Sequence, residues 1–414
     1  MILCFMASAG IALLAAAMFV LVGVHVVHGR RMRLAEARTL SGFQSAECPE
    51  SICVQLPVRN EEAVIQETLR SLCQLDWPRD RLEILVLDDN SSDQTLALAQ
   101  AAAAEWQELG VNIRIVSHET RVTKGGLLQF GLSLTKADYI AVFDADFRPE
   151  PDVLRKLMCF LREDDRTAFV QARLDYRNRN ATWVTRSQAL DLDTYYAFDQ
   201  VARTWAGIPV AYNGTGGIWR RSALVDAGGW TARSFLEDVD ASFRTFHRGW
   251  HGRFLTTVAV PGHLPETVRQ FATQRLRWSI GWHQQFQVLP LKTILKKGSL
   301  RSILFALFFL LDTSAPLLVA VNALLIAAAF ALGDAHATVA LVVFLVSLVA
   351  FIDARVIGTW LALRQCARRL EPRMVLDLWG VWGLYLVLLP VAIAAPALML
   401  GKAVPRFEQT LKSG

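Results

Sequence analysis

The sequence predicts an α/β domain with a mostly parallel sheet, joined to α-helical transmembrane segments. From about Ser51 to His263, short β-prone apolar runs alternate with stretches that carry apolar residues at helical spacing. This alternation is typical of parallel sheets with right-handed crossovers. Outside this region the chain is mostly apolar, and the long runs at both ends raise its hydrophobic content to 53%. Runs of this length can cross a bilayer.

Four strands and three helices are predicted in the first part of the α/β region. The β-prone runs that predict strands are residues 52–56, 82–87, 111–116 and 139–143. Helical spacing of apolar residues, or an alanine-rich run, predicts helices at residues 61–75, 94–109 and 125–134. The 139–143 run carries no charge, which favours a strand buried on both faces of the sheet.

The apolar stretch at residues 6–27 predicts a transmembrane helix. A cleaved signal peptide normally has a basic start, which this stretch lacks. Basic residues follow it instead, at Arg30, Arg31, Arg33 and Arg38. By the positive-inside rule, the N-terminus then faces outward and the chain enters the cytosol.

Three further spans are predicted at residues 303–332, 338–363 and 376–400, after an interfacial amphipathic helix. The arginines from Arg364 to Arg373 mark the cytosolic side. About four spans in all would leave the basic residues after 400 outside, against the positive-inside rule, so the span count stays open. Asp312 lies inside an apolar span, where it is expected to face a glycan channel or a packing partner.

These patterns divide the chain into five parts. They are a transmembrane helix (1–29), a cytosolic α/β domain (30–283), an interfacial helix (284–301), three transmembrane helices (302–402) and a tail (403–414). The net charge of +5 is small and its clusters flank the apolar runs, which indicates a membrane partner and not nucleic acid. Six cysteines without a CxxC pattern predict free thiols in a reducing compartment.

Carboxylates follow the predicted strands at the edge where ligands bind in such sheets. Asp144 and Asp146 come directly after the 139–143 strand, and two carboxylates this close repel unless a cation or a shared proton relieves them. A hard divalent ion carrying substrate phosphates is one such cation. Polar clusters also follow the first two strands, at residues 59–61 and 88–90. Three such strand ends favour a nucleotide site over simple helix capping.

The second half of the α/β region contributes different groups. The glycine-rich segment 213–217 is predicted to be a turn that lets backbone approach a ligand, and a helix is predicted to open at Trp219. Glu237 and Asp238 start another helix. On a further helix, predicted at residues 266–286, the spacing of Gln274, Arg277 and Trp278 puts them on one face.

Five motifs in this order and spacing make the chain resemble the membrane-embedded inverting glycosyltransferases of family 2, whose cytosolic nucleotide-sugar-binding domain is called GT-A. They are PVRNE at 57–61, LDD at 87–89, DAD at 144–146, ED at 237–238 and QRLRW at 274–278. The last has the family's Q-x-x-R-W pattern. Among cellulose-synthase-like members, the mannan and glucomannan synthases are most similar in their motifs, notably at residues 73–81, 143–147 and 213–220.

The resemblance implies a role for each matched residue. Asp238 would be the catalytic general base. Asp144 and Asp146 would bind Mg²⁺ or Mn²⁺, and Glu237 and Trp278 would bind the acceptor. Donor binding would fall to Glu61, Asp88, Asp89, Lys124, Asp144, Gln274 and Arg277. The activity implied is transfer of a hexose, with inversion, from UDP-glucose or GDP-mannose to a growing polysaccharide at the plasma or inner membrane.

Two alternatives remain open from the residues. One is a glycolipid synthase that adds one or a few sugars to ceramide or diacylglycerol, because no F-x-V-T-x-K gating segment of the cellulose synthase kind follows Trp278. The other is a transporter or scaffold that binds nucleotide without chemistry, against which Asp238 and the complete Q-x-x-R-W pattern argue. The sequence identifies no export partner.

Overall fold

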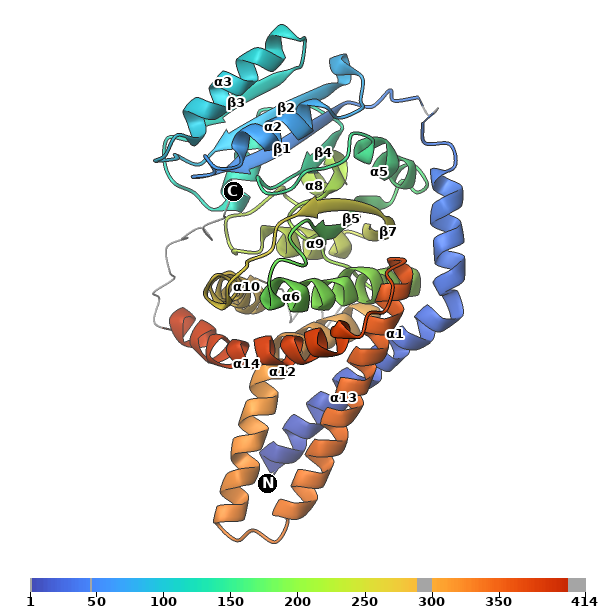
Figure 1. The fold of residues 1–414 in the computed structure, drawn as a ribbon, viewed down its shortest axis with the longest axis vertical. Coiled ribbons are helices and arrows are strands. Elements are labelled where there is room, and N and C mark those ends of the chain that lie inside the picture. The colour runs from blue at the N-terminus through green and yellow to red at the C-terminus, as the bar shows by residue number, and fades with distance from the viewer. Residues whose placement is uncertain (1, 45–46, 289–299, 401–414) are drawn as a thin grey trace.

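The structure is a computed structural model that describes residues 2–44, 47–288 and 300–400. Figure 1 shows a sheet with its helices at one end, a layer of helices in the middle and a projecting helical bundle at the other end. Most of the predicted interfacial helix and the predicted tail lie outside the described residues, as does the side chain of Asp312.

The described strands form one seven-stranded sheet in the order β3-β2-β1-β4-β6-β5-β7. Only β6 is antiparallel to its neighbours, so the predicted mostly parallel sheet is confirmed. The strand bounds are Ile52–Val58 (β1), Leu82–Asp88 (β2), Ile113–Ser117 (β3), Tyr139–Val142 (β4), Thr167–Tyr176 (β5), Gly217–Arg220 (β6) and His251–Gly262 (β7).

The helices of the α/β region connect these strands. Their bounds are Ile65–Cys73 (α2), Arg79–Arg81 (η1), Thr95–Glu108 (α3), Lys124–Ser133 (α4), Val153–Leu161 (α5), Trp183–Asp193 (α6), Thr194–Gln200 (η2, a π-helix), Val201–Ala206 (α7), Arg221–Asp226 (α8), Glu237–His247 (α9) and Val268–Val288 (α10). The longer apolar helices are Ile2–Leu40 (α1), Leu300–Ala331 (α12), Ala337–Gln365 (α13) and Arg373–Leu400 (α14).

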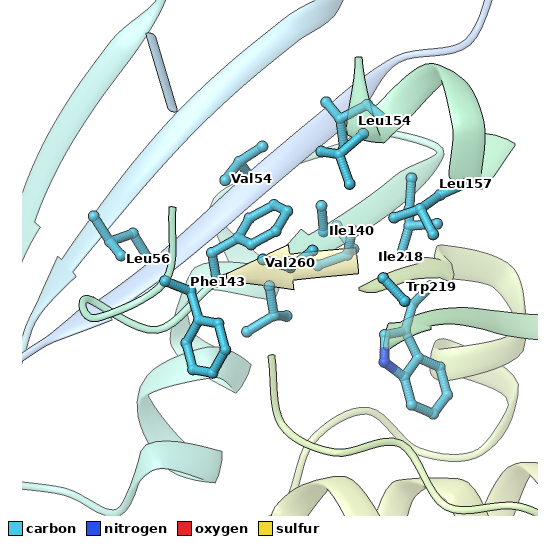
Figure 2. Packing of buried hydrophobic residues seen from close by; sticks show 14 of the residues in the cluster. Val54, Leu56, Ile140, Phe143, Leu154, Leu157, Ile218, Trp219 and Val260 are labelled. Carbon is cyan, nitrogen blue, oxygen red and sulfur yellow. The ribbon is translucent and has the colours of Figure 1, made fainter. Parts of the chain in front are cut away.

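Apolar side chains from β1, β4, β6, β7 and α5 pack into the core that fixes the sheet edge (Figure 2). Val54, Ile140 and Phe143 are fully buried there, as the charge-free 139–143 run predicts. Burying each such side chain contributes roughly 1.5–3 kcal/mol relative to leaving it exposed. Because β1, β2 and β4 are parallel and in register, their carboxyl ends meet at one edge of the sheet.

Two sequence expectations need correction. The segment from Gly217 to Arg220 is strand β6, and the helix that was expected to open at Trp219 begins only at Arg221. Strands β5, β6 and β7 were not predicted. Trp219 is fully buried between its strand neighbours and packs on Phe169 of β5, with ring centroids 4.6 Å apart. Four residues that end in an arginine are too few to show a periodic pattern. Pairing with the neighbouring strands therefore determines that this segment is a strand.

A layer of helices connects the sheet with the apolar helices. Helix α6 and helix α10 contact α14, and η2 contacts both β7 and α13. Figure 1 shows the N-terminal part of α1, the C-terminal part of α12 and α13 projecting together from this layer, whereas α14 runs across it. By length and hydropathy, α1, α13 and residues 373–391 of α14 could each cross a membrane, and the apolar helix at 315–331 is shorter.

Ion pairs join the sheet to the loop between α13 and α14. The side chain of Asp193 is 0% exposed. Its carboxylate accepts a hydrogen bond from Arg179 at 2.6 Å and forms an ion pair with Arg368 at 3.1 Å. Arg368 also donates to Asp175 at 2.7 Å, and Arg173 pairs with Asp175 at 3.3 Å. Three guanidinium groups thus surround two carboxylates where the α/β domain contacts the apolar helices.

Replacing Asp193 with Asn should lower the free energy of unfolding by on the order of 3 kcal/mol, because it leaves buried guanidinium groups without a compensating charge. The measurement is the midpoint of thermal unfolding in lipid nanodiscs. Arg373→Ala is the matched control, since its pair with Glu371 is half exposed and such pairs contribute about 0–1 kcal/mol. Equal midpoints for the two variants would show that the buried network does not stabilise this junction.

Candidate active site

The carboxyl edge of the sheet opens into a cavity of about 980 Å³. All but one of the predicted site residues line this cavity. They are Glu61, Asp89, Lys124, Asp144, Asp146, Glu237, Asp238, Gln274, Arg277 and Trp278. The structure therefore brings together residues that follow β1, β2 and β4 and residues of α4, α9 and α10, although the first and last of them lie more than 200 positions apart in the sequence.

Asp88 is the exception. It is 1% exposed, and its carboxylate accepts hydrogen bonds from the Ser117 hydroxyl at 2.9 Å and the Ser91 amide at 3.3 Å. These contacts tie the end of β2 to β3 and to the following loop. Asp89 faces the cavity instead, where it pairs with Arg59 at 3.2 Å and accepts from the Val122 amide at 2.8 Å.

Lys124 lies among the acidic residues of the cavity. Its ammonium is 2.6 Å from Asp144, 3.8 Å from Glu237 and donates to the Gly214 carbonyl at 3.0 Å. Burial alone would lower the pKa of Lys124, but the carboxylates around it raise that pKa above its ordinary value. The ammonium therefore stays charged and neutralises part of the acidic cluster.

Two glycines allow this close approach of chain segments. At Gly125, a Cβ atom would lie 2.1 Å from the Thr231 carbonyl oxygen and 2.8 Å from the Glu237 Cβ, so α4 could not pack on the start of α9. Gly214 has φ +72° and brings its backbone to the position where a Cβ would be 3.1 Å from an Asp238 oxygen. The 213–217 segment thus places backbone beside the cluster, as the sequence predicts.

Glu237 and Asp238 sit in the first turn of α9, next to each other and almost fully buried. Burial raises the pKa of both carboxyl groups, and the charge of Glu237 adds to the rise at Asp238, where the pKa reaches about 8. The Val239 amide donates to Asp238 at 2.8 Å. Asp238 is thus a carboxyl group with proton affinity far above that of an exposed aspartate, which suits a general base.

The Q-x-x-R-W helix, α10, covers the opposite side of the cavity. Arg277 lines the same cavity as Asp144 and Asp146; burial lowers the pKa of Arg277, and the charges of the two carboxylates act against this. The ring of Trp278 is covered by the Arg275 guanidinium at 4.4 Å from its centroid. Gln274 lines the cavity beside them. A cation, an aromatic ring and an amide therefore face the paired aspartates.

Residues 53–226 match the sequence profile of the family Glycosyl transferase family 2. The chain carries a family 2 glycosyltransferase domain. Its curated relatives include glucomannan 4-beta-mannosyltransferase 2 of Arabidopsis thaliana, 36% identical over 59% of this chain and 47% of the relative. Glucomannan 4-beta-mannosyltransferase 1 of Oryza sativa subsp. japonica is 35% identical over 59% and 48%. The chain spans about half the length of these relatives.

A solved structure is similar over most of the chain. The mannosyltransferase PcManGT from Pyrobaculum calidifontis, in complex with GDP-Man and Mn²⁺, matches with a TM-score of 0.57 over 90% of this chain and 99% of that chain, at 22% identity. This likeness concerns the fold, and it confirms the expected GT-A architecture of the family 2 domain with its mostly parallel sheet.

The paired aspartates of the family 2 domain fit a divalent cation only as part of a shared ligand set. No group of three or more His, Cys, Asp or Glu side chains that could hold a metal occurs among the described residues. Asp144 and Asp146 line the cavity, and the Asp144 side chain is partly exposed. Two carboxylates completed by water and diphosphate oxygens are the usual environment of Mg²⁺ in nucleotide sites.

The family 2 domain also contains cavity residues that the sequence did not indicate. Tyr195 and Tyr196 of η2 line the cavity, and the Tyr195 hydroxyl accepts from the Asn213 side chain at 3.3 Å. The π-helical turn shifts the phase of the helix by part of a turn, so the 3.6-residue period of α6 does not predict which side chains of η2 face inward. No sequence signal available here could have placed them.

Proposed function

We propose that this protein is an inverting β-glycosyltransferase that moves a hexose from a nucleotide-sugar to an acceptor hydroxyl at the membrane. The observation that carries the proposal is the single cavity in which the paired aspartates, Arg277 and the high-pKa carboxyl of Asp238 converge. GDP-mannose is the first donor to test, since the similar proteins include mannosyltransferases and one was solved with GDP-Man, and UDP-glucose is the second.

The chemistry assigned to these residues is a single displacement. The acceptor oxygen forms a bond to the anomeric carbon as the bond from that carbon to the diphosphate breaks, and the electron pair leaves with the diphosphate. Asp238 takes the hydroxyl proton. When bound between Asp144, Asp146 and the diphosphate, Mg²⁺ or Mn²⁺ would supply charge stabilisation to the leaving group. Arg277 adds a fixed positive charge, and Lys124 holds Asp144 in place.

The growing polysaccharide is the acceptor that the relatives' names suggest. A second candidate is a glycolipid product, which a specific observation favours: the cavity does not end at Trp278 but continues between α12, α13 and α14. Incubation of the purified protein in lipid with labelled GDP-mannose and UDP-glucose in parallel would test the function. Release of nucleoside diphosphate together with labelled glycan or glycolipid supports the proposal, and binding of both donors without transfer would refute it.

We also propose that the family 2 domain lies in the cytosol and that α14 lies along the membrane surface. The C-terminal ends of α1 and α13, where the sequence carries its two arginine clusters, lie beside the α/β domain, whereas the N-terminus and the α12–α13 loop lie at the far end of the bundle (Figure 1). Three crossings, by α1, α12 and α13, return the chain to the cytosol before α14. The basic residues after 400 then obey the positive-inside rule.

Cysteine labelling in intact cells would test this topology. In a variant without the native cysteines, Gly333→Cys in the α12–α13 loop should react with a membrane-impermeant maleimide. Asn90→Cys in the α/β domain and Gly414→Cys should react only after the membrane is opened. Labelling of Gly414→Cys in intact cells would support four spans instead of three. Labelling of Asn90→Cys in intact cells would refute the cytosolic location of the α/β domain.

A further inference from the structure

The cavity extends from the catalytic residues into the apolar helices. Its far end is lined by aliphatic and aromatic side chains of three helices: Val319 of α12, Leu348, Phe351 and Ile352 of α13, and Leu386 and Leu389 of α14. We call this part the apolar chamber. These described side chains offer no hydrogen bonds to a ligand, and a chain of sugars would leave its hydroxyl groups unpaired against them. An alkyl chain would instead gain free energy with each methylene that it buries there.

A polar cluster marks the boundary between the chamber and the catalytic half. Arg355 of α13 donates to the Asp191 carboxylate and to the Tyr385 hydroxyl, at 3.2 Å from the latter. Tyr385 donates to Asp191 at 3.0 Å. Trp379 and Trp382 line the cavity nearby, and the Trp382 ring centroid is 5.7 Å from that of Tyr385. Aromatic residues of this kind gather at the level of lipid head groups.

On the catalytic side of this boundary, the cavity has buried acceptors for hydrogen bonds. Gln200 is 2% exposed, and its Oε1 accepts no hydrogen bond from the described residues; the same holds for Oδ1 of Asn213. Both residues line the cavity. A buried carbonyl oxygen without a donor destabilises the folded protein because it has lost its hydrogen bonds with water. A hydroxyl group of a bound molecule would satisfy each of them.

From this arrangement we propose that the acceptor on which transfer begins is a neutral, hydroxyl-bearing lipid. Its tail occupies the apolar chamber, and its head extends past Gln200 toward Asp238. This inference rests on the proposed function and names the acceptor class. The lipid oxygen bonds to the anomeric carbon, the proton goes to Asp238 and the diphosphate leaves with the electron pair.

Charge separates a neutral lipid from a lipid phosphate. The positive charge of Arg355 is balanced by Asp191, so the boundary cluster carries no net charge. At the transfer end, the Lys124 ammonium is likewise paired with Asp144 and Glu237. A phosphate acceptor would meet two cations that are already paired with carboxylates, and it would not need a base to remove a proton.

Competing acceptors would test the proposal. The protein is placed in phosphatidylcholine nanodiscs with labelled GDP-mannose or UDP-glucose and, separately, dioleoylglycerol plus ceramide, undecaprenyl phosphate, or mannotetraose. We expect label to move into the neutral lipids and to be extracted into organic solvent. Transfer only to mannotetraose or only to undecaprenyl phosphate would overturn the inference, as would bound donor without transfer to any neutral lipid. If neither donor binds or turns over, the proposed function itself fails.

A pair of tryptophan variants on one helix separates the chamber from the surrounding lipid. Ile352→Trp fills the chamber, whereas Val346→Trp adds the same ring to a position of α13 that is 65% exposed. We expect Ile352→Trp to lower transfer to the neutral lipid by about tenfold, equivalent to about 1.4 kcal/mol. Nucleotide-sugar binding should be unchanged in both variants, which shows that the α/β domain is folded. Equal transfer by the two variants would overturn the proposal.

Discussion

Asp238→Asn is expected to lower turnover by roughly 10²- to 10⁴-fold while the dissociation constant of the donor changes little. The amide keeps the shape of the side chain and can still accept from the Val239 amide, but it cannot take the acceptor's proton. Turnover and donor binding should be measured on the same preparation. A turnover near that of the parent protein, or a loss of donor binding, would show that Asp238 is not the base.

Asp240→Asn is the matched control for this substitution. Asp240 lies on the same helix, is 2% exposed and accepts from Thr231 at 2.7 Å and Arg244 at 3.0 Å, but it does not line the cavity. Its replacement should lower thermal stability and leave turnover of the folded fraction within a few-fold. The two variants therefore separate loss of a buried carboxylate from loss of the base.

The pH dependence adds a second readout. Because burial and Glu237 raise the pKa of Asp238 to about 8, the rate of the parent protein should rise with pH through that region, and Asp238→Asn should lack this rise. Rising pH has the opposite effect on stability, because the raised pKa of Asp238 makes the folded state less stable as the carboxyl ionises. A carboxyl whose pKa is higher in the folded state destabilises the fold as pH rises from its ordinary pKa toward 8, so Asp238→Asn should be at least as stable as the parent at neutral pH.

Asp146→Asn is expected to weaken donor binding by tenfold or more, which corresponds to about 1.4 kcal/mol. The reason is that, in the proposed role, Asp146 is one of two protein carboxylates that hold the cation for the diphosphate. Removal of divalent ions with a chelator should abolish transfer by the parent protein, and Mg²⁺ or Mn²⁺ should restore it. Donor affinity is measured by calorimetry with and without added metal. Full activity after exhaustive chelation would exclude the metal role.

Asp88→Asn is the matched control for the metal prediction. It removes a carboxylate from a neighbouring strand end, but the Asp88 side chain bonds with Ser117 and the Ser91 amide outside the cavity lining. We expect added metal to change the donor affinity of the Asp88→Asn variant as much as it changes that of the parent protein. A loss equal to that of Asp146→Asn would return Asp88 to the donor site where the sequence motif places it.

The sequence indicates the parts of the molecule that depend on local pattern. The charge-free run at 139–143 and its parallel partners give the sheet edge, and that edge places Asp89, Asp144 and Asp146 in one cavity. The sequence does not distinguish Asp88, the last residue of β2, from Asp89, because adjacent side chains at a strand end point in different directions and tertiary packing decides which of them faces the cavity. Nor does it show that Lys124 contacts Asp144, since that contact depends on how α4 packs against α9.

The features that were not predicted depend on contacts between distant segments. Strand β6 is four residues long and exists because β4 and β5 pair with it on both sides. The tyrosines of η2 reach the cavity through a π-helical turn, which has no distinct sequence period. Hydropathy gives α14 the length of a span, but its contacts with α6 and α10 determine how it lies.

The anomeric configuration of the first product tests the central claim most directly. Purified protein in nanodiscs is given GDP-α-mannose or UDP-α-glucose with the neutral lipid acceptor, and the new linkage is assigned by NMR from its anomeric coupling constants. The proposed roles, with Asp238 as the single base and a cation assisting the departing diphosphate, predict a single displacement and therefore a β-linked sugar. An α-linked product would contradict this account, because it would require retention of configuration.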